Sequence, residues 1–410
     1  MFSFTSYYIT TTHHFNFTLF AMFFIDILQN ISSYFFCIVA LLDPVDALHL
    51  KFPAFLLFAL SLCLNNTINI NNLPIIVAML LCNIISFIIG NAAGFKIEMP
   101  LMIHFLIFFV LQTCILWDYA IDLLHPIIVG SCLLSIATII GFTSMIYFPE
   151  LEAVIYEYSE ENDIIFVMSH RTFLGVDFVS FCFKSLPIIT IPACICFKDL
   201  LYSKSHKLRN LILSLLFLIA MFCAGNRAMI LGLLLIVFVI AYPAFSKKRF
   251  FRPLFAIASV IALIIIWMAL TEKGEWSNDV KYGHLVSYVN HFSENWQYLL
   301  FGTGAGSYFY SIGFGYDTNL SEWTYIELFR MYGIIGGALI LFFLLKPLFR
   351  WNEKREYIKN WEPVSLGYIL FLVICGSNPY LINSTGLICI IFMYSYIAND
   401  KYCKQTIDYQ

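Results

Sequence analysis

Charged residues are scarce in this chain. Asp, Glu, Lys and Arg make up 12 % of its 410 residues, against roughly 25 % in a typical soluble domain. Hydrophobic residues make up 60 %, and the mean hydropathy is +0.82. An ordinary water-soluble fold is therefore excluded, and the few charges outside basic loops become functional candidates. The net charge of −3 gives no indication of nucleic-acid binding.

Other features are missing as well. No basic n-region with an A-x-A-like cleavage site opens the chain, so the first apolar run should remain as a membrane helix. No long linker, low-complexity tract or fixed repeat divides the chain. None of the 12 cysteines falls within 272–321, so we expect no structural disulfides. Residues 1–410 should form a single integral membrane domain.

Apolar runs near the ~20 residues that cross a bilayer recur along the whole chain. They predict an all-α polytopic membrane protein with about twelve transmembrane helices. The run 211–245 has Gly225-Asn226-Arg227 at its middle and is too long for one helix, so it predicts a hairpin of two spans. The expected spans are 16–42, 48–64, 73–90, 100–117, 124–148, 171–197, 210–224, 228–245, 253–271, 322–346, 363–382 and 384–398.

Lys and Arg collect in alternate loops. By the positive-inside rule these loops and both termini face the cytoplasm. The opposite, extracytoplasmic side then receives 149–170, 225–227, a large loop at 272–321, and 376–384. The basic residues are Lys198, Lys204, Lys207, Arg209, Lys247, Lys248, Arg249, Arg252, Lys346, Arg350, Lys354, Arg355, Lys359, Lys401 and Lys404.

Two arginines stand alone at the outer ends of apolar runs. Arg171 follows the acidic segment 149–170, and Arg227 stands at the hairpin turn. Two guanidinium groups at the outer headgroup level can hold a lipid-linked pyrophosphate, because each offers a rigid fork to phosphate oxygens. Alternatively, each contacts lipid phosphates or neutralises a nearby carboxylate.

The segment 272–321 is rich in aromatic residues and contains Gly302-Thr303-Gly304-Ala305-Gly306. The glycines lack the spacing and the strand-helix context of a dinucleotide site, so they indicate a tight backbone close to a ligand instead. Aromatic side chains here suit either sugar stacking or the interfacial belt. His284 and His291 have no metal-ligand spacing around them, and neither a metal nor a cofactor is expected. Lys281 adds a positive charge that suits phosphate.

Two carboxylates and an arginine open the next apolar run. Glu327 and Arg330 are three apart and are expected to pair on one helical face. Glu322 lies about 140° around the helix from Glu327, which excludes an acid pair. Asn319-x-x-Glu322 also matches a capping box, which would give Glu322 a purely structural role.

Taken together, these residues resemble the Wzy-type O-antigen and capsule polymerases, which are relatives of the O-antigen ligases. The resemblance covers most of the second half of the chain. It rests on the order and outer placement of His170-Arg171-Thr172-Phe173-Leu174-Gly175, Gly225-Asn226-Arg227-Ala228, Gly302-x-Gly304-x-Gly306-Ser307, Glu322-x-x-Tyr325-x-Glu327-Leu328-x-x-x-x-Gly333 and Ser377-Asn378-Pro379-Tyr380-Leu381-x-Asn383-Ser384-Thr385-Gly386.

The resemblance implies a GT-C-like bundle in the bacterial inner membrane and an inverting, metal-independent glycosyl transfer. The donor would be a glycan on undecaprenyl diphosphate and the acceptor a lipid-linked repeat unit. The resemblance also implies a chain-length regulator as a protein partner. The resemblance assigns the binding of the diphosphate to Arg171 and Arg227, and Arg330 is a third, weaker candidate for this role. Fixed cations of this kind stabilise the charge that develops on a leaving diphosphate. Lys281, Tyr325 and Asn378 complete the expected substrate-binding set.

The chain departs from the pattern of the related ligases at the expected general base. The related ligases carry a histidine where this chain has Glu322, which favours a polymerase with Glu322 as the base; His284 and Glu327 are the alternatives. Two other functions stay open. A ligase would share the fold and the donor, whereas a flippase would be expected to show repeated halves and charges at the membrane midplane. Asp177 and Lys184, inside the expected span 171–197, are the only charges of that kind.

Overall fold

A computed structural model describes most of the chain, with gaps. The described residues are 5–65, 73–100, 121–161, 166–173, 176–245, 276–349, 361–376 and 378–398, with isolated residues at 102, 103, 105, 253 and 257. Among these, side chains are described from residue 24 onward, except those of residues 65, 159, 160, 166–173, 176–179, 276, 277, 361 and 398. The expected spans 100–117 and 253–271 lie almost wholly outside these residues.

The described chain is mostly helical, as the all-α prediction requires. Five of its helices are long and apolar enough to cross a membrane: residues 24–42 of α1, and α3, α5, α9 and α13. The helices are α1 (Thr5–Leu42), α2 (Lys51–Asn65), α3 (Leu73–Ala92), α5 (Leu124–Tyr147), α6 (Glu150–Glu161), the short 3-10 helix η2 (Leu186–Ile189), α7 (Thr190–Tyr202), α8 (Lys207–Cys223), α9 (Arg227–Phe245), α11 (Trp276–Glu294), α12 (Trp296–Phe301), α13 (Thr324–Phe349), α15 (Trp361–Gly376) and α16 (Ser384–Ala398).

The turn between two helices that was predicted within 211–245 is confirmed, and the second helix, α9, is long and apolar enough to cross a membrane. α8 ends at Cys223 and α9 begins at Arg227, with Gly225 in the left-handed region (φ 60°) between them. The Asn226 side chain accepts a hydrogen bond from the backbone N–H of Ala228 at 2.9 Å. This contact satisfies one of the free N–H groups at the start of α9, so the turn fixes where that helix begins.

The prediction of a helix over 171–197 is wrong for its first half. Strands β1 (Phe166–Phe173) and β2 (Val176–Phe183) form an antiparallel hairpin there, and helix resumes only with η2 and α7. Apolar residues of β-branched and aromatic type suit a strand as well as a helix, and hydropathy alone does not separate the two. Asp177 lies on β2 and Lys184 in the turn after it, so the two do not share a helical face.

The large loop predicted at 272–321 is a folded unit. α11 and α12 occupy its first part, and two short strands, β3 (Phe309–Ser311) and β4 (Tyr316–Thr318), pair in antiparallel fashion in its last part. The acidic segment 149–170 likewise contains α6 and much of β1. Polar composition predicted exposure to water for both segments, but it gave no information on their secondary structure.

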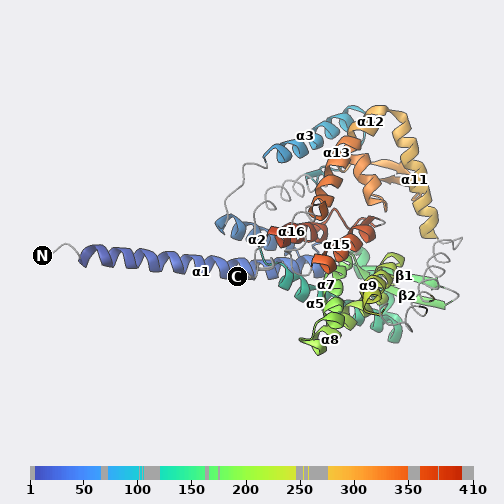
Figure 1. The fold of residues 1–410 in the computed structure, drawn as a ribbon. Helices are drawn as coiled ribbons and strands as arrows, with labels where there is room; N and C mark the ends of the chain where they lie inside the picture. Colours follow the sequence, from blue (N-terminus) through green and yellow to red (C-terminus); the bar gives the residue numbers. More distant parts are fainter. Residues whose placement is uncertain are drawn as a thin grey trace.

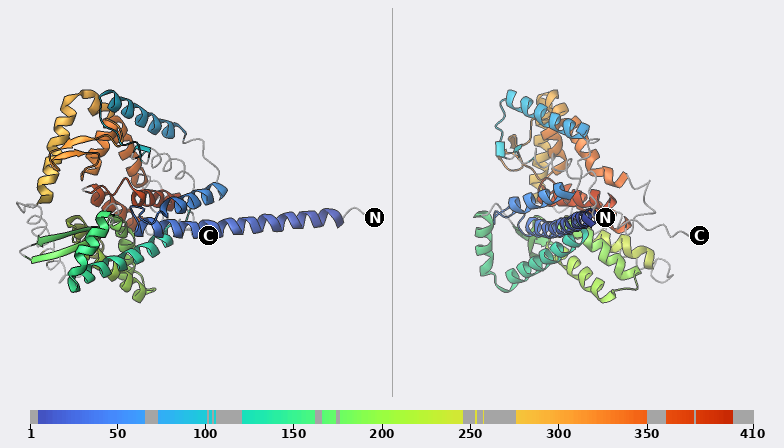
Figure 2. Two further views of the ribbon diagram at one scale, coloured as in Figure 1. Left: turned by 180° about the vertical axis from the view of Figure 1, so that it is seen from behind. Right: turned by 90° about the vertical axis from the view of Figure 1, so that its left-hand side faces the viewer.

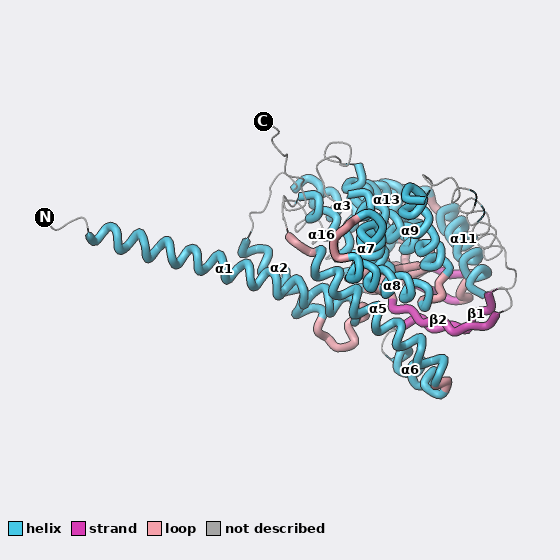
Figure 3. Tube along the Cα trace, turned by 60° about the horizontal axis from the view of Figure 1, so that its bottom comes forward, coloured by secondary structure: helices cyan, strands magenta, loops and turns pink. Residues whose placement is uncertain are grey.

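The elements form two groups joined by a central layer (Figures 1 and 2). One group contains α3, α11, α12, α13 and the β3–β4 hairpin, and the other contains α5, α7, α8, α9 and the β1–β2 hairpin. α15 and α16 lie between them, and the N-terminal part of α1 projects beyond the rest of the molecule. In Figure 3, α6 and the β1–β2 hairpin lie along one edge of the molecule. α11 extends from the first group towards α9. Residues near the start of α11 thereby come into contact with the start of α9.

Candidate functional site

The site is built around a break in α13. Gly333 has a left-handed backbone (φ 68°, ψ −177°), which interrupts the helix and frees carbonyl groups before it. Two of these carbonyls accept hydrogen bonds from residues 302–308, which we call the glycine-rich loop. Thr303 N–H donates to Arg330 O and Gly304 N–H donates to Met331 O, both at 3.0 Å. The loop therefore replaces the missing turn of helix. Broken helices with such partners occur in membrane proteins where backbone lines a functional cavity.

Glycine at these positions permits the close backbone crossing. A Cβ atom on Gly333 would lie 2.2 Å from the backbone of Leu300, and one on Gly302 would lie 2.3 Å from Met331 O. The glycine-rich sequence thus forms the tight backbone that its composition predicted. Its contact here is another segment of the same chain.

The segment around Glu98 braces the glycine-rich loop from the other side. Ile97 forms an antiparallel bridge with Ser307. The Glu98 carboxylate accepts hydrogen bonds from Tyr308 OH at 2.8 Å and from Asn319 Nδ2 at 2.5 Å. One carboxylate thereby connects the glycine-rich loop with the residues that precede α13.

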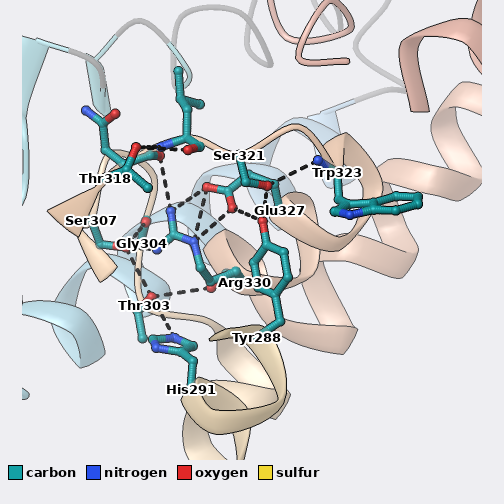
Figure 4. Close-up of polar contacts among 12 residues, drawn as sticks. Tyr288, His291, Thr303, Gly304, Ser307, Thr318, Ser321, Trp323, Glu327 and Arg330 are labelled. Carbon is teal, nitrogen blue, oxygen red and sulfur yellow. Dashed lines mark hydrogen bonds and ion pairs between the residues drawn. The ribbon is translucent and has the colours of Figure 1, made fainter. Parts of the chain in front are cut away.

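The predicted pair between Glu327 and Arg330 is confirmed and is buried. Arg330 Nε lies 3.0 and 3.1 Å from the two Glu327 oxygens, and Nη2 lies 2.5 Å from Oε1 (Figure 4). The guanidinium also donates to Ser307 Oγ at 2.7 Å and stacks over the Phe309 ring at 4.5 Å. Arg330 is fully buried. Its engagement within the protein favours a structural role over the diphosphate role that the family resemblance implied.

Tyr288 on α11 joins this pair. Its hydroxyl donates to Glu327 Oε2 at 2.6 Å and also bonds Ser321 Oγ. Burial and the Glu327 carboxylate hold the pKa of Tyr288 well above its usual value near 10. The phenol therefore stays protonated and serves as a donor to the carboxylate at every physiological pH.

Three of the predicted site residues lie along the first turns of α11, at a partly exposed edge of this unit. Lys281 Nζ lies 3.5 Å from Glu322 Oε2, and each side chain is 26 % exposed. Arg227 Nη1 donates to Asn278 Oδ1 at 3.0 Å. Asn278 is three residues before Lys281 on α11, so the two lie on one helical face. We call Arg227, Asn278, Lys281 and Glu322 the rim cluster. The capping-box prediction for Glu322 is wrong, because α13 begins at Thr324 and Glu322 pairs with Lys281 instead.

Two other predicted residues support the start of α13. Thr324 Oγ1 donates to Asn378 O at 2.6 Å, and Tyr325 OH donates to Leu372 O at 2.7 Å. The Asn378 side chain donates to Ile374 O at 3.3 Å. Asn378 lies in the turn between α15 and α16, where the sequence predicted an outer turn. Both residues therefore position the helix that follows Glu322.

The two histidines of α11 are buried. Ser311 Oγ lies 2.8 Å from His284 Nδ1 and also accepts from Phe314 N–H. Ser311 is itself fully buried, so its hydroxyl proton is best satisfied by donation to Nδ1, which leaves the His284 proton on Nε2. Nε2 has no hydrogen-bond partner among the described residues. A protonated Nε2 does not accept a proton, which argues against His284 as the general base.

Burial also keeps these rings neutral. It lowers the pKa of His284, with the Glu327 carboxylate opposing the shift and the Lys281 ammonium adding to it. Burial and the positive charge of Arg330 lower the pKa of His291 to about 3. His291 lies among the rings of Phe95, Tyr298 and Phe309. It is thus a packed residue of the core of this unit.

The structure describes the backbone of Arg171 but not its side chain. The residue lies on β1 opposite Phe178. Its role in binding diphosphate stays a prediction. Within the described residues, no group of three or more His, Cys, Asp or Glu side chains is arranged to hold a metal ion.

The sequence analysis missed Glu98, Tyr288, Asn278 and Ser321. A signal for Tyr288 was present, because Lys281, His284, Tyr288 and His291 recur at intervals of three, four and three and so share one face of a helix. That signal becomes visible only once 276–294 is recognised as helical. Glu98 gave no signal, since its partners lie 210 and 221 residues further along the chain.

Comparison with protein-family models, with curated protein sequences and with solved structures finds no match.

Proposed function

We propose that this protein is a membrane glycosyltransferase that polymerises lipid-linked repeat units of an O-antigen or capsular polysaccharide. The observation that carries the proposal is the rim cluster. It combines cations from α9 and α11 with a carboxylate that precedes α13, at a partly exposed position. Cations suit a diphosphate leaving group, and the carboxylate suits deprotonation of an attacking hydroxyl.

The proposed reaction uses the cluster in two ways. Arg227 and Lys281 bind the diphosphate of the donor, and Arg171 is a further candidate for this role. Diphosphate at Lys281 competes with Glu322, so the carboxylate loses its cation as the donor binds. The freed carboxylate can then accept a hydrogen bond from the acceptor hydroxyl.

Glu322 then takes the proton of an acceptor hydroxyl, whose oxygen attacks the anomeric carbon of the donor glycan. The bond from that carbon to the diphosphate oxygen breaks, and undecaprenyl diphosphate departs with the bonding electrons. Inversion follows from attack on the face opposite the leaving group. The step needs no metal or cofactor, because Arg227 and Lys281 stabilise the departing charge.

The wider setting follows from the family resemblance. We propose about twelve spans in a GT-C-like bundle of the bacterial inner membrane, with both termini in the cytoplasm. The folded segment 276–321 would lie on the extracytoplasmic side beside the lipid-linked substrates. A chain-length regulator is the expected protein partner. Among the described helices, the apolar character of α3, α5, α9 and α13 supports placement in a membrane.

A ligase that transfers finished glycan to another acceptor is the second candidate. Its donor chemistry would use the same rim cluster, and only the acceptor would differ. The carboxylate at 322 in place of a histidine favours the polymerase. A flippase is disfavoured, because Asp177, one of the two charges that suggested a midplane path, lies on a β-hairpin.

The test is the pattern of surface glycan in a strain that lacks this gene. Restoration with wild type should rebuild a ladder of repeat units, whereas Arg227→Ala should leave the acceptor lipid with a single unit. Arg209→Ala is the matched control, because Arg209 is exposed at the other end of the α8–α9 hairpin. It should restore the ladder fully.

Other outcomes separate the candidates. Long polymer that stays on its carrier lipid in the deletion strain would identify a ligase. Absence of any repeat unit from the outer surface would identify a flippase. Full polymer from Arg227→Ala, at normal protein level, would remove Arg227 from the mechanism.

A further inference from the structure

The buried residues Tyr288, Glu327 and Arg330 form a connected unit that we call the clamp. Each belongs to a helix, Tyr288 to α11 and the other two to α13, and all three are at most 2 % exposed. The clamp contacts two loops that are separate in sequence (Figure 4). Arg330 reaches Ser307 of the glycine-rich loop at 2.7 Å and the Asn319 carbonyl at 3.3 Å.

The hydrogen bonds of the clamp run in one direction. Trp323 N–H donates to Ser321 Oγ at 3.2 Å. Tyr288 has a single hydroxyl proton, which goes to the Glu327 carboxylate, so Ser321 Oγ–H donates to the Tyr288 oxygen. A continuous chain of donors thus runs from the backbone beside Glu322 to the charge of Glu327. Charge-assisted hydrogen bonds of this kind are stronger than neutral ones.

Glu322 lies between two attachments to α11. On one side, Ser321 is held by Tyr288; on the other, the Trp323 indole N–H donates to Lys281 O at 3.0 Å. Lys281 and Tyr288 are seven apart, which is two turns along one face of α11. The short segment 321–323 is therefore fixed along that face, with Glu322 directed to Lys281 at the rim.

A role in stability alone accounts poorly for the clamp. A buried ion pair is often no more stabilising than apolar residues of the same volume, whereas it specifies one arrangement of its neighbours. Direct contact of Arg330 with substrate is disfavoured by its complete burial. What the clamp does fix is the position of the residue on which the proposed reaction depends.

We infer that Tyr288, Glu327 and Arg330 are positioning residues, which hold the segment 321–323 against α11 and so set the location of the Glu322 carboxylate. This inference rests on the proposed function for its catalytic meaning. The physical claim, that the Tyr288–Ser321 hydrogen bond immobilises residue 322, is independent of any activity.

The experiment measures the mobility of residue 322 directly. The full chain carrying Glu322→Cys is purified in detergent without substrate, and its rate of reaction with a maleimide-polyethylene glycol reagent is recorded. The chain without this substitution gives the background from native cysteines. The rate is then measured with Tyr288→Phe, which removes the hydroxyl but keeps the ring against Phe309, and with Ser321→Ala, which removes the other end of the same bond.

Each substitution should raise the labelling rate about fivefold, as expected for loss of one hydrogen bond of ordinary strength. The effect in the double variant should be smaller than the product of the two single effects, because both substitutions remove the Tyr288–Ser321 bond. Tyr282→Phe is the matched control, since Tyr282 is on α11 but 70 % exposed, and it should leave the rate unchanged. If Tyr288→Phe does not fold, Ser321→Ala alone decides the outcome.

An unchanged rate in both single variants, or effects that multiply in the double variant, would overturn the inference. Polymer formation is measured separately with Glu322 in place. There Tyr288→Phe should lower turnover with little change in KM, since the diphosphate-binding cations are untouched. If the labelling results hold and the wild-type chain makes no polymer, the clamp stands and the proposed function fails.

Discussion

Glu322 is the residue on which the proposed chemistry depends most. Its carboxylate faces Lys281 and is about one quarter exposed, whereas Glu327 is buried and bonded on both oxygens. Only the first is free to meet a substrate. Geometry therefore separates two carboxylates that the sequence left as alternatives.

Replacement of Glu322 by Gln should lower the rate of polymer formation by about a hundredfold or more, the usual contribution of a general base. The amide keeps the size of the side chain but accepts no proton. The measurement is polymer formed per unit time by purified protein from lipid-linked repeat units, with protein amount checked on the same gel. Near-normal rates from Glu322→Gln would transfer the role of base to another residue.

His291 gives the molecule a predictable dependence on pH. Its pKa in the folded protein is about 3, whereas that of an unfolded histidine is about 6.5. Between these values the unfolded chain binds a proton that the folded chain does not. Stability is therefore complete above pH 6.5 and falls as pH decreases, by up to about 1.4 kcal/mol for each pH unit.

The thermal midpoint of the detergent-solubilised protein should accordingly fall between pH 7 and pH 5.5. The change should be smaller in His291→Gln, which removes the titrating ring. His284, whose pKa burial also lowers, should account for part of what remains. Equal changes in wild type and His291→Gln would show that the ring is not buried in the neutral form.

At the scale of elements, the break in α13 is the feature that assembles the site. Gly333→Ala places a side chain in the left-handed region and 2.2 Å from the Leu300 backbone. Strain of this type costs about 1–3 kcal/mol before the clash is counted. We expect a clear fall in thermal midpoint together with loss of polymer.

Gly232→Ala is the control for that substitution. Gly232 is inside α9 with ordinary helical backbone, and among the described residues a Cβ there would meet only the ends of two side chains, of Ile374 and Met221, at 3.2 Å. Its thermal midpoint should stay near that of wild type. Equal effects of the two substitutions would contradict a special role for the break.

The sequence predicted the long apolar helices and the α8–α9 turn because each depends on local hydropathy or on one glycine-containing turn. It did not predict the β1–β2 hairpin, since an apolar run of Phe, Val and Ser fits a strand or a helix equally well. α11 was missed for another reason. It is a polar helix, and low hydropathy does not distinguish a polar helix from a loop.

The site was partly predictable. The Glu327–Arg330 pair follows from a spacing of three within one helix. The meeting of Arg227, Lys281 and Glu322 depends on how α9, α11 and α13 pack, which no local pattern encodes. From the sequence, the distribution of Lys and Arg predicted only that the three residues lie on the same side of the membrane.

For the whole molecule, the decisive question is the side of the membrane on which the rim cluster lies. Alkaline phosphatase fused after residue 205, before α8, should be inactive because that end is expected in the cytoplasm. The same enzyme fused after residue 225, in the turn before α9, should be active. Reversed activities would place the rim cluster in the cytoplasm and contradict a reaction on lipid-linked units outside.

The Glu98 contact has a consequence for how the protein is made. Glu98 emerges from the ribosome 210 residues before Tyr308, and 221 before Asn319, the two side chains that bond its carboxylate. During most of synthesis this carboxylate has neither partner, and the glycine-rich loop that it braces does not yet exist. The site is thus among the last parts of the protein to be completed. A chain that stops shortly before residue 319 would contain Arg227, Lys281 and the glycine-rich loop but would lack Glu322, Glu327 and Arg330.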